Sequence, residues 1–401
     1  MAFEKHDVAI QELSVGECMQ YDVLDASGIV LLRNGQLLSQ EVIDGWMRRG
    51  FARVVLSREA PARKSDRLAE AESARLVRPY DAELLEEIDR SVAKAKRAVD
   101  QILLELAYNE EADMRGLDSV IDGYINALST DTDAVLSRTG AQKSPSENVT
   151  NERLMIRSIK MAVLGAATAT TMGLSRSECR ALATAGMLHD MSLYEETLSA
   201  LLNTHPSIKE RSDVFFRHAL HSAELFSQCQ GISDFVRIVI TQVHEQVDGN
   251  GFPRGLLGHH MNVLSRILNI VDAFLTLTDP EPPQPAYVAS DALAYLLNQA
   301  GYGAFDRECM RAFVATLSVY PIGSKVELST SQTATVMRST PTDPLRPIVR
   351  IDGGPAMVDL RQANITIERP VLEDEFPHRQ RMPRSHMESV LWKPAFLDVA
   401  D

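Results

Sequence analysis

The sequence predicts a mainly α-helical fold with a small N-terminal α+β domain and a small β unit near the C-terminal end. Residues 152 to about 318 place apolar side chains at three- and four-residue steps almost without a break, which is typical of helices. Residues 11 to about 58 instead alternate apolar and polar side chains, as strands do. The alternation returns after Tyr320-Pro321, in SKVELSTSQTATVMRS and RPIVRIDGG.

The composition is that of a globular protein with two or three compact units. Of the 401 residues, 45% are hydrophobic and 24% are charged, and no apolar run approaches the ~20 residues that cross a bilayer. A formal net charge of -14 repels polyanions and disfavours DNA and RNA as partners. The four cysteines lack CxxC spacing and the charged start differs from a secretion signal, so we expect a cytoplasmic protein without a membrane span.

Residues 1–58 are predicted to form a small, strand-rich regulatory domain. Turn-forming residues occur at 25–28 and 34–35 in YDVLDASGIVLLRNG. A short helix is predicted in SQEVIDGWMRRG, with Ser39 as its N-cap and Gly50 as its stop signal. No feature of this domain names the signal that it senses.

Residues 59–145 are predicted to be a linker followed by a helical stalk. The linker REAPARKSDRLAEAESARLVRP is charged and low in apolar residues. From Asp81 to about Arg138 the pattern is helical, with apolar residues at Leu84, Ile88, Val92, Ala95, Val99, Leu103 and Leu106. An amphipathic helix needs a partner, so this stretch either packs on the next domain or forms a homodimer.

The rest of the chain divides into three parts. Residues 146–318 are predicted to be a helical domain, with turn-rich interruptions at 248–262 and 280–286. Residues 319–372 are predicted to be a small β unit. Residues 373–401, rich in proline, arginine and histidine, are predicted to be an irregular tail.

Histidine and aspartate residues inside the helical domain have the chemistry of a metal site. AGMLHDMSL places His189 and Asp190 side by side, a pair that by itself is more often a buried histidine bonded to a carboxylate. His218, His244 and Asp272, however, also fall on predicted helices. Imidazole and carboxylate together suit Fe²⁺, Mn²⁺ or Zn²⁺. Two such ions would clamp a phosphodiester and lower the pKa of a bridging water, with Asp190 as the natural bridge.

The spacing of these residues resembles the HD-GYP family, a branch of the HD-domain phosphohydrolases that act on cyclic di-GMP. His218 lies 29 positions after His189 and Asp272 lies 28 positions after His244, as in the family. HEQVDGNGFPRGL resembles the HHExxDGxGYP motif, with Phe252 at the usual tyrosine, and SRILNIVDAFLTLT is similar to the family's final helix. The resemblance covers roughly residues 150 to 370 and implies an HD-type helical bundle with a divalent metal cofactor.

The resemblance also implies roles for individual residues. The metal ligands would be His189, Asp190, His218, His244 and Asp272, with Asp190 and His244 as catalytic residues. Glu245 and Asp248 would form hydrogen bonds behind the ligands or within the loop. Arg266 would be a structural ion pair more readily than a phosphate ligand.

Three positions depart from the family pattern. Arg157 in RSIKMAVLG stands where the family has its first ligand, a histidine, and a protonated arginine cannot bind a cation. Leu193 replaces the lysine of HDxGK, and Val243 replaces the first histidine of HHE. Five ligands are few for two ions but sufficient for one. Arg157 would either pair with Asp190 or Asp272 in place of a lost metal, or bind a ligand phosphate.

The other histidines of this region carry weaker expectations. His221 lies three residues after His218, so it is either a substitute ligand or a surface or capping residue. His205, His259 and His260 fall in predicted turns, where we expect solvent exposure.

Two functions follow from this pattern. The first is a metal-dependent phosphodiesterase of reduced activity, which hydrolyses cyclic di-GMP to the linear dinucleotide or to GMP. The second is a catalytically silent regulator that binds cyclic di-GMP, a related nucleotide or a protein partner. The five retained ligands favour the enzyme, whereas Arg157, Leu193 and Val243 favour the regulator. A purely structural role is disfavoured, because five polar residues at catalytic spacing are poor core material.

Overall fold

The computed structural model describes residues 5–16, 19, 21–24, 30–32, 38–48, 53–57, 79–107, 112–140, 150–194, 208–227, 229, 231–279, 286–340, 343–372 and 379–387. The chain forms two compact units, Met1–Arg75 and Leu76–Asp401. Residues 58–78 of the predicted linker, the predicted turns at 25–28 and 34–35, and His205 lie outside the described residues. The mainly helical fold class predicted from the sequence is confirmed.

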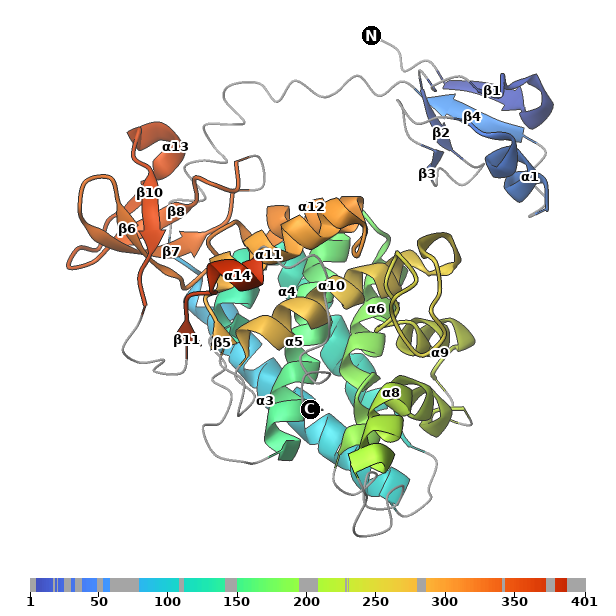
Figure 1. The fold of residues 1–401 in the computed structure, drawn as a ribbon, viewed down its shortest axis with the longest axis horizontal. Coiled ribbons are helices and arrows are strands. Elements are labelled where there is room, and N and C mark those ends of the chain that lie inside the picture. Colours follow the sequence, from blue (N-terminus) through green and yellow to red (C-terminus); the bar gives the residue numbers. More distant parts are fainter. Residues whose placement is uncertain are drawn as a thin grey trace. The chain divides into compact units, whose positions relative to one another are not determined.

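The described residues of the first unit form a four-stranded antiparallel sheet with one α-helix (Figure 1). Its elements are β1 (Lys5–Ala9), a 3-10 turn (Ile10–Glu12), β2 (Asp22–Leu24), β3 (Val30–Leu32), α1 (Gln40–Arg48) and β4 (Arg53–Ser57), and the strand order is β1-β4-β2-β3. Ser39 caps α1 as predicted, since its Oγ accepts the backbone N–H of Val42 at 3.3 Å. Ile10, Val23, Trp46 and Val54 are buried, so this unit has a core of its own.

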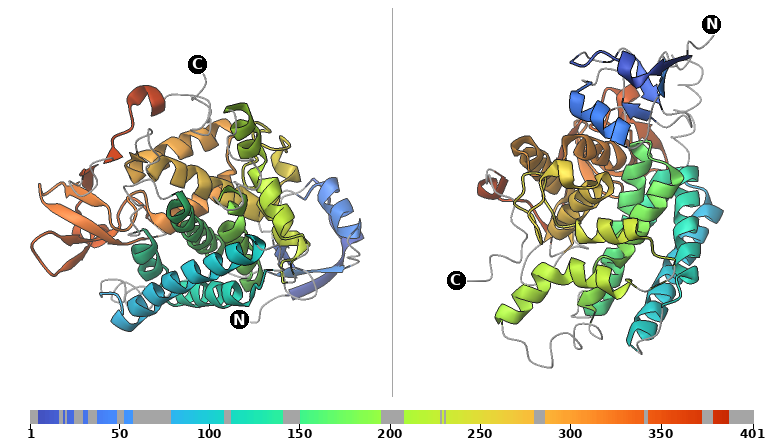
Figure 2. Two further views of the ribbon diagram at one scale, coloured as in Figure 1. Left: turned by 90° about the horizontal axis from the view of Figure 1, so that it is seen from below. Right: turned by 90° about the vertical axis from the view of Figure 1, so that its right-hand side faces the viewer.

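The second unit is a bundle of helices followed by a small sheet (Figure 1). Its helices are α3 (Ala82–Ala107), α4 (Arg115–Gly140), α5 (Thr150–Thr171), α6 (Arg176–Leu188), η2 (Met191–Leu193), α8 (Ile208–Leu225), α9 (Asp234–Thr241), η3 (Gly258–His260), α10 (Val263–Thr278), α11 (Ala289–Tyr302) and α12 (Arg307–Leu317). Helix α5 lies in the middle and contacts α4, α6, α10 and α12 (Figures 1 and 2). None of the described helices combines the length and the apolar character that a membrane span requires.

Helices α3 and α4, predicted as a stalk, pack against each other and against the helices that follow. Their apolar residues, Ile88, Val99, Leu117 and Ile121 among them, belong to the same buried cluster as those of α5, α6 and α10. The sequence left two partners open for this helical stretch, the next domain or a second copy of the chain. In the structure, α3 and α4 pack on the helical domain of the same chain. Helix α4 is kinked at Asp131, whose backbone is not helical (φ -155°, ψ 95°).

The C-terminal sheet has five antiparallel strands, in the order β10-β6-β7-β8-β9. They are β6 (Lys325–Leu328), β7 (Thr333–Arg338), β8 (Ile348–Ile351), β9 (Met357–Asp359) and β10 (Ile367–Pro370), with a short helix α13 (Leu360–Ala363). The alternation of TATVMR puts Ala334 and Val336 inside, against Val326 and Leu328. This sheet and helices α8 and α9 lie on opposite sides of the bundle (Figures 1 and 2).

In residues 379–387, the described part of the tail, there are two short elements that the sequence pattern did not predict. They are β11 (Arg379–Gln380), which pairs in parallel with β5 (Ala286–Tyr287), and α14 (Arg384–Met387). The guanidinium of Arg381 donates to both carboxylate oxygens of Asp291 on α11, at 2.6 and 3.0 Å. These elements are held by contacts with residues far away in the sequence, such as Asp291. They could therefore not be predicted from the local amino-acid composition.

Candidate metal centre

His189 and Asp190 stand where α6 ends and the chain turns into η2. His189 is the C-cap residue of α6, and Asp190 leaves helical geometry with φ -103° and ψ 11°. Because adjacent residues inside a helix point about 100° apart, this helix end allows both side chains to reach one place. Ser192 joins the turn to α8: its backbone N–H donates to Ser222 Oγ at 3.1 Å, and its Oγ donates to the backbone carbonyl of His218 at 2.8 Å.

Three buried residues bring their donor atoms together. Asp190 Oδ1 lies 3.2 Å from His218 Nε2, and His218 Nε2 lies 2.8 Å from His244 Nε2. One donor atom from each of Asp190, His218 and His244 falls within 4.8 Å of the others. Two ligands that bind one ion at 2.0–2.1 Å lie ~3 Å apart, so the donor set fits a single divalent cation.

His189 adds a fourth donor atom, whose surroundings require a positive charge. Its Nδ1 lies 2.9 Å from the carbonyl oxygen of Gly186, which can only accept, so Nδ1 carries the proton in that hydrogen bond. Its Nε2 is buried, has no hydrogen-bond partner among the described residues, and lies 3.1 Å from Asp190 Oδ2. A lone pair facing a carboxylate oxygen requires a cation or a second proton between them. The residues present therefore fit a metal ion.

Asp272 contacts the other side of His244. Its Oδ2 accepts from His244 Nδ1 at 3.1 Å, which leaves the lone pair of His244 Nε2 for the cluster. A carboxylate behind a histidine in this way orients the ring and raises its basicity as a ligand. Among the described residues, Asp272 is not one of the three whose donors gather within 4.8 Å, although the family resemblance implies a ligand there.

The charges of this cluster shift its pKa values in opposite directions. Burial alone would raise the pKa of the Asp190 carboxyl, but His189 and His218 hold it well below its ordinary value. Burial would lower the pKa of His189, but Asp190 raises it. Burial lowers the pKa of His244, and Asp272 only partly opposes this. Asp190 thus stays anionic and His244 stays neutral, which are the states that bind a cation.

Arg157 pairs with the cluster's second carboxylate. Its Nη2 donates to Asp272 Oδ1, to the backbone carbonyl of Asp272 at 3.2 Å and to Thr276 Oγ1 at 2.8 Å. Its Nε lies 3.9 Å from Asp190 Oδ2. Burial would lower the pKa of the guanidinium, but Asp272 and Asp190 raise it above its ordinary value. Of the two roles expected for Arg157, this geometry corresponds to pairing with the carboxylates.

The loop that follows His244 is held by its own carboxylates. Glu245 is fully buried, and its two oxygens each accept one backbone N–H at 2.8 Å, from Arg254 and from Leu256. Asp248 accepts from the backbone N–H and the side-chain amide of Asn250, both at 3.0 Å. At Gly251 a Cβ atom would lie 2.1 Å from the backbone nitrogen of Gln246, so only glycine fits there.

Phe252 packs against the centre through its ring. It stacks on the His244 imidazole at 4.9 Å with an interplanar angle of 13°, and its backbone N–H donates to the His244 carbonyl at 3.1 Å. The stacked ring fixes the plane of His244 from one side while Asp272 fixes it from the edge. A phenylalanine in place of tyrosine retains this packing.

The other predicted positions lie away from the cluster. Arg266 donates to Asp306 at 3.1 Å and to the Met261 carbonyl at 2.9 Å, as in a structural ion pair. His221 is half-buried and is not part of the cluster among the described residues, and His259 and His260 are exposed. Sequence reasoning missed Ser192 and Ser222, since a hydrogen bond between separate helices leaves no periodic signal in the sequence.

The departures from the family pattern are accommodated by the fold. Val243 is buried in the main core, and its backbone carbonyl accepts the Asn269 side-chain amide at 3.1 Å. Leu193 is half-buried at the end of η2. Neither position offers the charge or the imidazole that the family pattern has there.

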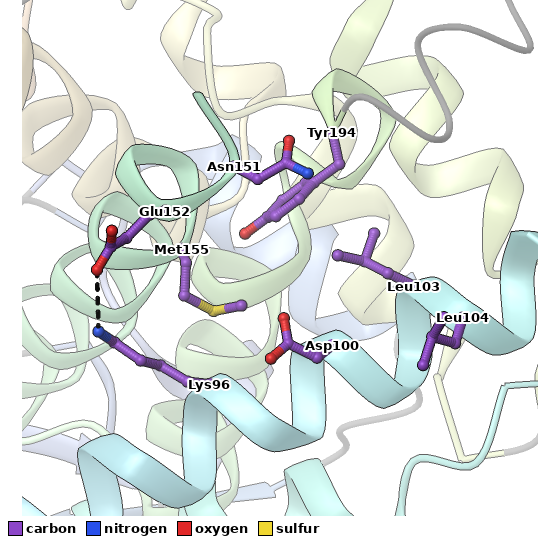
Figure 3. Close-up of a pocket in the computed structure, with 8 residues that line it drawn as sticks. All are labelled: Lys96, Asp100, Leu103, Leu104, Asn151, Glu152, Met155 and Tyr194. Carbon is purple, nitrogen blue, oxygen red and sulfur yellow. Dashed lines mark ion pairs between the residues drawn. The ribbon is translucent and has the colours of Figure 1, made fainter. Parts of the chain in front are cut away.

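A cavity of about 470 Å³ lies between α3, the first turns of α5 and Tyr194, the residue after η2 (Figure 3). Lys96 and Glu152 form an ion pair at its edge, with Nζ and Oε1 3.7 Å apart (Figure 3). Its lining residues include Asp100 and Met155 but none of the clustered metal-site residues. It is therefore separate from the candidate metal centre.

Comparison with known proteins places the helical unit among HD domains. An HD-domain family model matches residues 135–309. The chain is 24% identical over 259 residues to the cyclic di-GMP phosphodiesterase PA4108 of Pseudomonas aeruginosa, covering 65% of this chain and 61% of that protein. It is 32% identical over 158 residues to the cyclic di-GMP phosphodiesterase response regulator RpfG of Xanthomonas campestris, covering 39% of this chain and 41% of that protein.

A solved structure also resembles the chain. Bd1817, a HDG"Y"P protein from Bdellovibrio bacteriovorus, superposes with a TM-score of 0.45 at 13% sequence identity, covering 77% of this chain and 98% of that one. Against the two phosphodiesterases, this chain spans less than two thirds of their length.

Proposed function

Because this chain belongs to the HD-GYP family of HD-domain proteins, we propose that it is a metal-dependent phosphodiesterase of reduced activity that hydrolyses cyclic di-GMP. One observation carries the proposal: Asp190, His218 and His244 come from separate elements and meet, buried, with their donor atoms within 4.8 Å. Burying a carboxylate among imidazoles costs free energy unless a cation compensates its charge. A purely structural role in the core is therefore disfavoured for these residues.

We assign the ligand set from the geometry. Asp190, His218 and His244 would hold the ion, with His189 Nε2 as a further donor. The ion would be Fe²⁺, Mn²⁺ or Zn²⁺, and one ion fits this set better than two. A divalent cation bound there supplies an acidified water and stabilises negative charge on a phosphoryl oxygen. Asp272 would orient His244 through Nδ1.

The catalytic residues we propose are Asp190 and His244. Asp190 would remain ionised because His189 and His218 lower its pKa. His244 would be kept neutral by burial and fixed in its plane by Phe252. We expect reduced activity because Leu193 lacks the charge of the family's lysine and Val243 lacks the imidazole of the family's histidine. Each loss of ~1.4 kcal/mol of transition-state stabilisation slows the reaction about tenfold.

A second candidate is a silent regulator that binds cyclic di-GMP, a related nucleotide or a protein partner. It is favoured by Arg157, which engages Asp272 with its own charge. For either of these two functions, we propose that the protein is cytoplasmic. A homodimer through the helical pair would use the outward face of α3, where Leu104 is exposed.

The test is metal analysis of the purified protein combined with chromatography of cyclic di-GMP and its products in added Mn²⁺ or Fe²⁺. We expect slow turnover to the linear dinucleotide or GMP, and loss of both metal and turnover in Asp190→Ala. Asp118→Ala, which removes an aspartate paired with Arg180 on the bundle surface, is the control and should retain both. Nucleotide binding without turnover in the metal-loaded protein would identify the silent regulator instead.

A further inference from the structure

We propose that the Arg157 guanidinium takes the place of a second metal ion in this centre, and thereby restricts the chain to one ion. This inference rests on the proposed metal site but not on its hydrolytic activity. It concerns the two carboxylates of the cluster, Asp190 and Asp272, and the charge that balances them.

Both carboxylate oxygens of Asp272 already accept a hydrogen bond from a side chain of the cluster. Oδ1 accepts from Arg157 Nη2, and Oδ2 accepts from His244 Nδ1 at 3.1 Å. A carboxylate engaged in this way on both sides acts behind the ligands. The ligands that are left, Asp190 with the Nε2 atoms of its neighbouring histidines, surround one position.

Arg157 is located where a bridging cation would be needed. Its Nη2 contacts Asp272, while its Nε lies 3.9 Å from Asp190 Oδ2, so one guanidinium approaches both carboxylates. Two further acceptors hold it, the Asp272 carbonyl at 3.2 Å and Thr276 Oγ1 at 2.8 Å. Arginine stays protonated in proteins, so the charge is permanent and needs no exchange with solvent.

The same contact orients a metal ligand. Arg157 fixes Asp272, Asp272 fixes the Nδ1–H form of His244, and His244 Nε2 then faces the cluster. Arg157 is therefore a positioning residue as well as a counter-charge. A role in helix packing alone is the competing explanation, since Lys160 on the same helix forms a second ion pair at 2.7 Å with Asp279, the C-cap residue of α10.

Metal stoichiometry separates these explanations. The purified chain is saturated with Mn²⁺, desalted and analysed by elemental mass spectrometry, with electron paramagnetic resonance to detect coupled Mn²⁺ pairs. We expect about one Mn²⁺ per chain for the natural protein. Arg157→His removes the guanidinium, frees Asp272 Oδ1 and supplies an imidazole, so we expect about two Mn²⁺ per chain and a coupled spectrum.

Arg180→His is the matched control, because Arg180 pairs with Asp118 in the same unit but outside the cluster. It should stay at one uncoupled ion. Two ions in the natural protein, or a folded Arg157→His protein that stays at one, would overturn the inference. Uptake of one ion without hydrolysis would contradict the proposed enzyme and leave this inference standing, whereas no uptake by the natural protein would contradict both.

Arg157→Lys and Arg157→Gln keep the inference testable if Arg157→His does not fold. Arg157→Lys retains the charge and should bind one ion and melt at nearly the natural temperature. Arg157→Gln leaves Asp272 uncompensated, so it should melt lower without metal and recover as Mn²⁺ is raised beyond one equivalent. A metal-free Arg157→Gln protein as stable as the natural one would show that the guanidinium does not balance the carboxylates.

Discussion

Two of the imidazoles at the metal centre, His189 and His244, are oriented by an acceptor on the far nitrogen. His189 donates through Nδ1 to the Gly186 carbonyl, and His244 donates through Nδ1 to Asp272. The Nε2 atoms are therefore the ones left to bind a cation. A histidine without such a partner would sample two ring orientations and both tautomers, so the acceptors are as much a part of the site as the ligands.

Glu245 provides the first residue-scale prediction. Its two oxygens accept the backbone N–H groups of Arg254 and Leu256, and a glutamine offers only one oxygen and an N–H₂ group in their place. We expect Glu245→Gln to lower the free energy of unfolding by about 2 kcal/mol, because one buried N–H loses its charged acceptor. Urea denaturation measures this difference.

The control is Glu224→Gln, at an exposed position of α8, which should change the free energy of unfolding by less than about 0.5 kcal/mol. Equal stability of both variants would contradict the loop-fixing role of Glu245.

At the scale of elements, the kink of α4 is tied to the C-terminal sheet. Arg338 on β7 lies 2.9 Å from Asp131 and 3.7 Å from Asp133, and its guanidinium stacks on the Tyr80 ring at 4.5 Å. Ser339 donates to Asp133 through its backbone N–H at 3.3 Å and through Oγ at 2.6 Å. The non-helical backbone at Asp131 is therefore held by the contacts that Asp131 and Asp133 make with Arg338 and Ser339, about 200 positions further along the chain.

Asp133 makes this junction sensitive to pH. Burial raises the pKa of its carboxyl to about 6, and the Ser339 hydrogen bonds only partly oppose this. The folded state therefore binds the proton more tightly than the unfolded state, so this stabilisation is present below pH 4 and is lost as pH rises through about 6. The loss amounts to ~3 kcal/mol at most.

Asp133→Asn is the matching prediction. The amide oxygen still accepts from Ser339, and Arg338 still pairs with Asp131, so we expect the variant to fold. Relative to the natural protein, its free energy of unfolding should rise by ~2 kcal/mol between pH 4.5 and 7.5. Urea titrations at both pH values measure this. Asp118→Asn, at a half-buried position of the same helix, should show no such relative change. A pH-independent difference for Asp133→Asn would contradict the assignment.

At the scale of the whole molecule, the chain contains two units that each bury their own apolar residues. The first has Ile10, Val23, Trp46 and Val54 inside its sheet, whereas the second has one continuous helical core. The metal-centre residues all belong to the second unit. A unit that has its own core is expected to fold without its neighbour.

Deletion of residues 1–75 tests this independence. We expect the melting temperature of the remaining helical unit to change by less than about 2 °C, which for a domain of this size is within ~1 kcal/mol. Its Mn²⁺ content per chain should also be unchanged, because no described ligand lies in the deleted part. Calorimetry and elemental analysis are the measurements. A large fall in melting temperature, or loss of the ion, would show that the first unit completes the second.

Periodicity and spacing are local properties of a chain, and much of this protein was predicted from them. The helical class, the strand-rich beginning and the sheet after Tyr320 follow from alternation at two or at three to four residues. The candidate cluster follows from the resemblance to the HD-GYP family, whose intervals of 29 and 28 residues this chain shares. The tail was the weakest prediction, since β11 and α14 are ordered by contacts such as Arg381 with Asp291.

The sequence by itself therefore determined which side chains are candidates for the chemistry, and that they lie in the helical part of the chain. Only the tertiary structure decided how their charges are balanced. Arg157 and Asp272 are 115 positions apart, and no local pattern states that the guanidinium engages one carboxylate oxygen while His244 engages the other. The physical reason is that an ion pair in a low-dielectric interior depends on distances of a few ångströms between helices, and packing alone sets those distances.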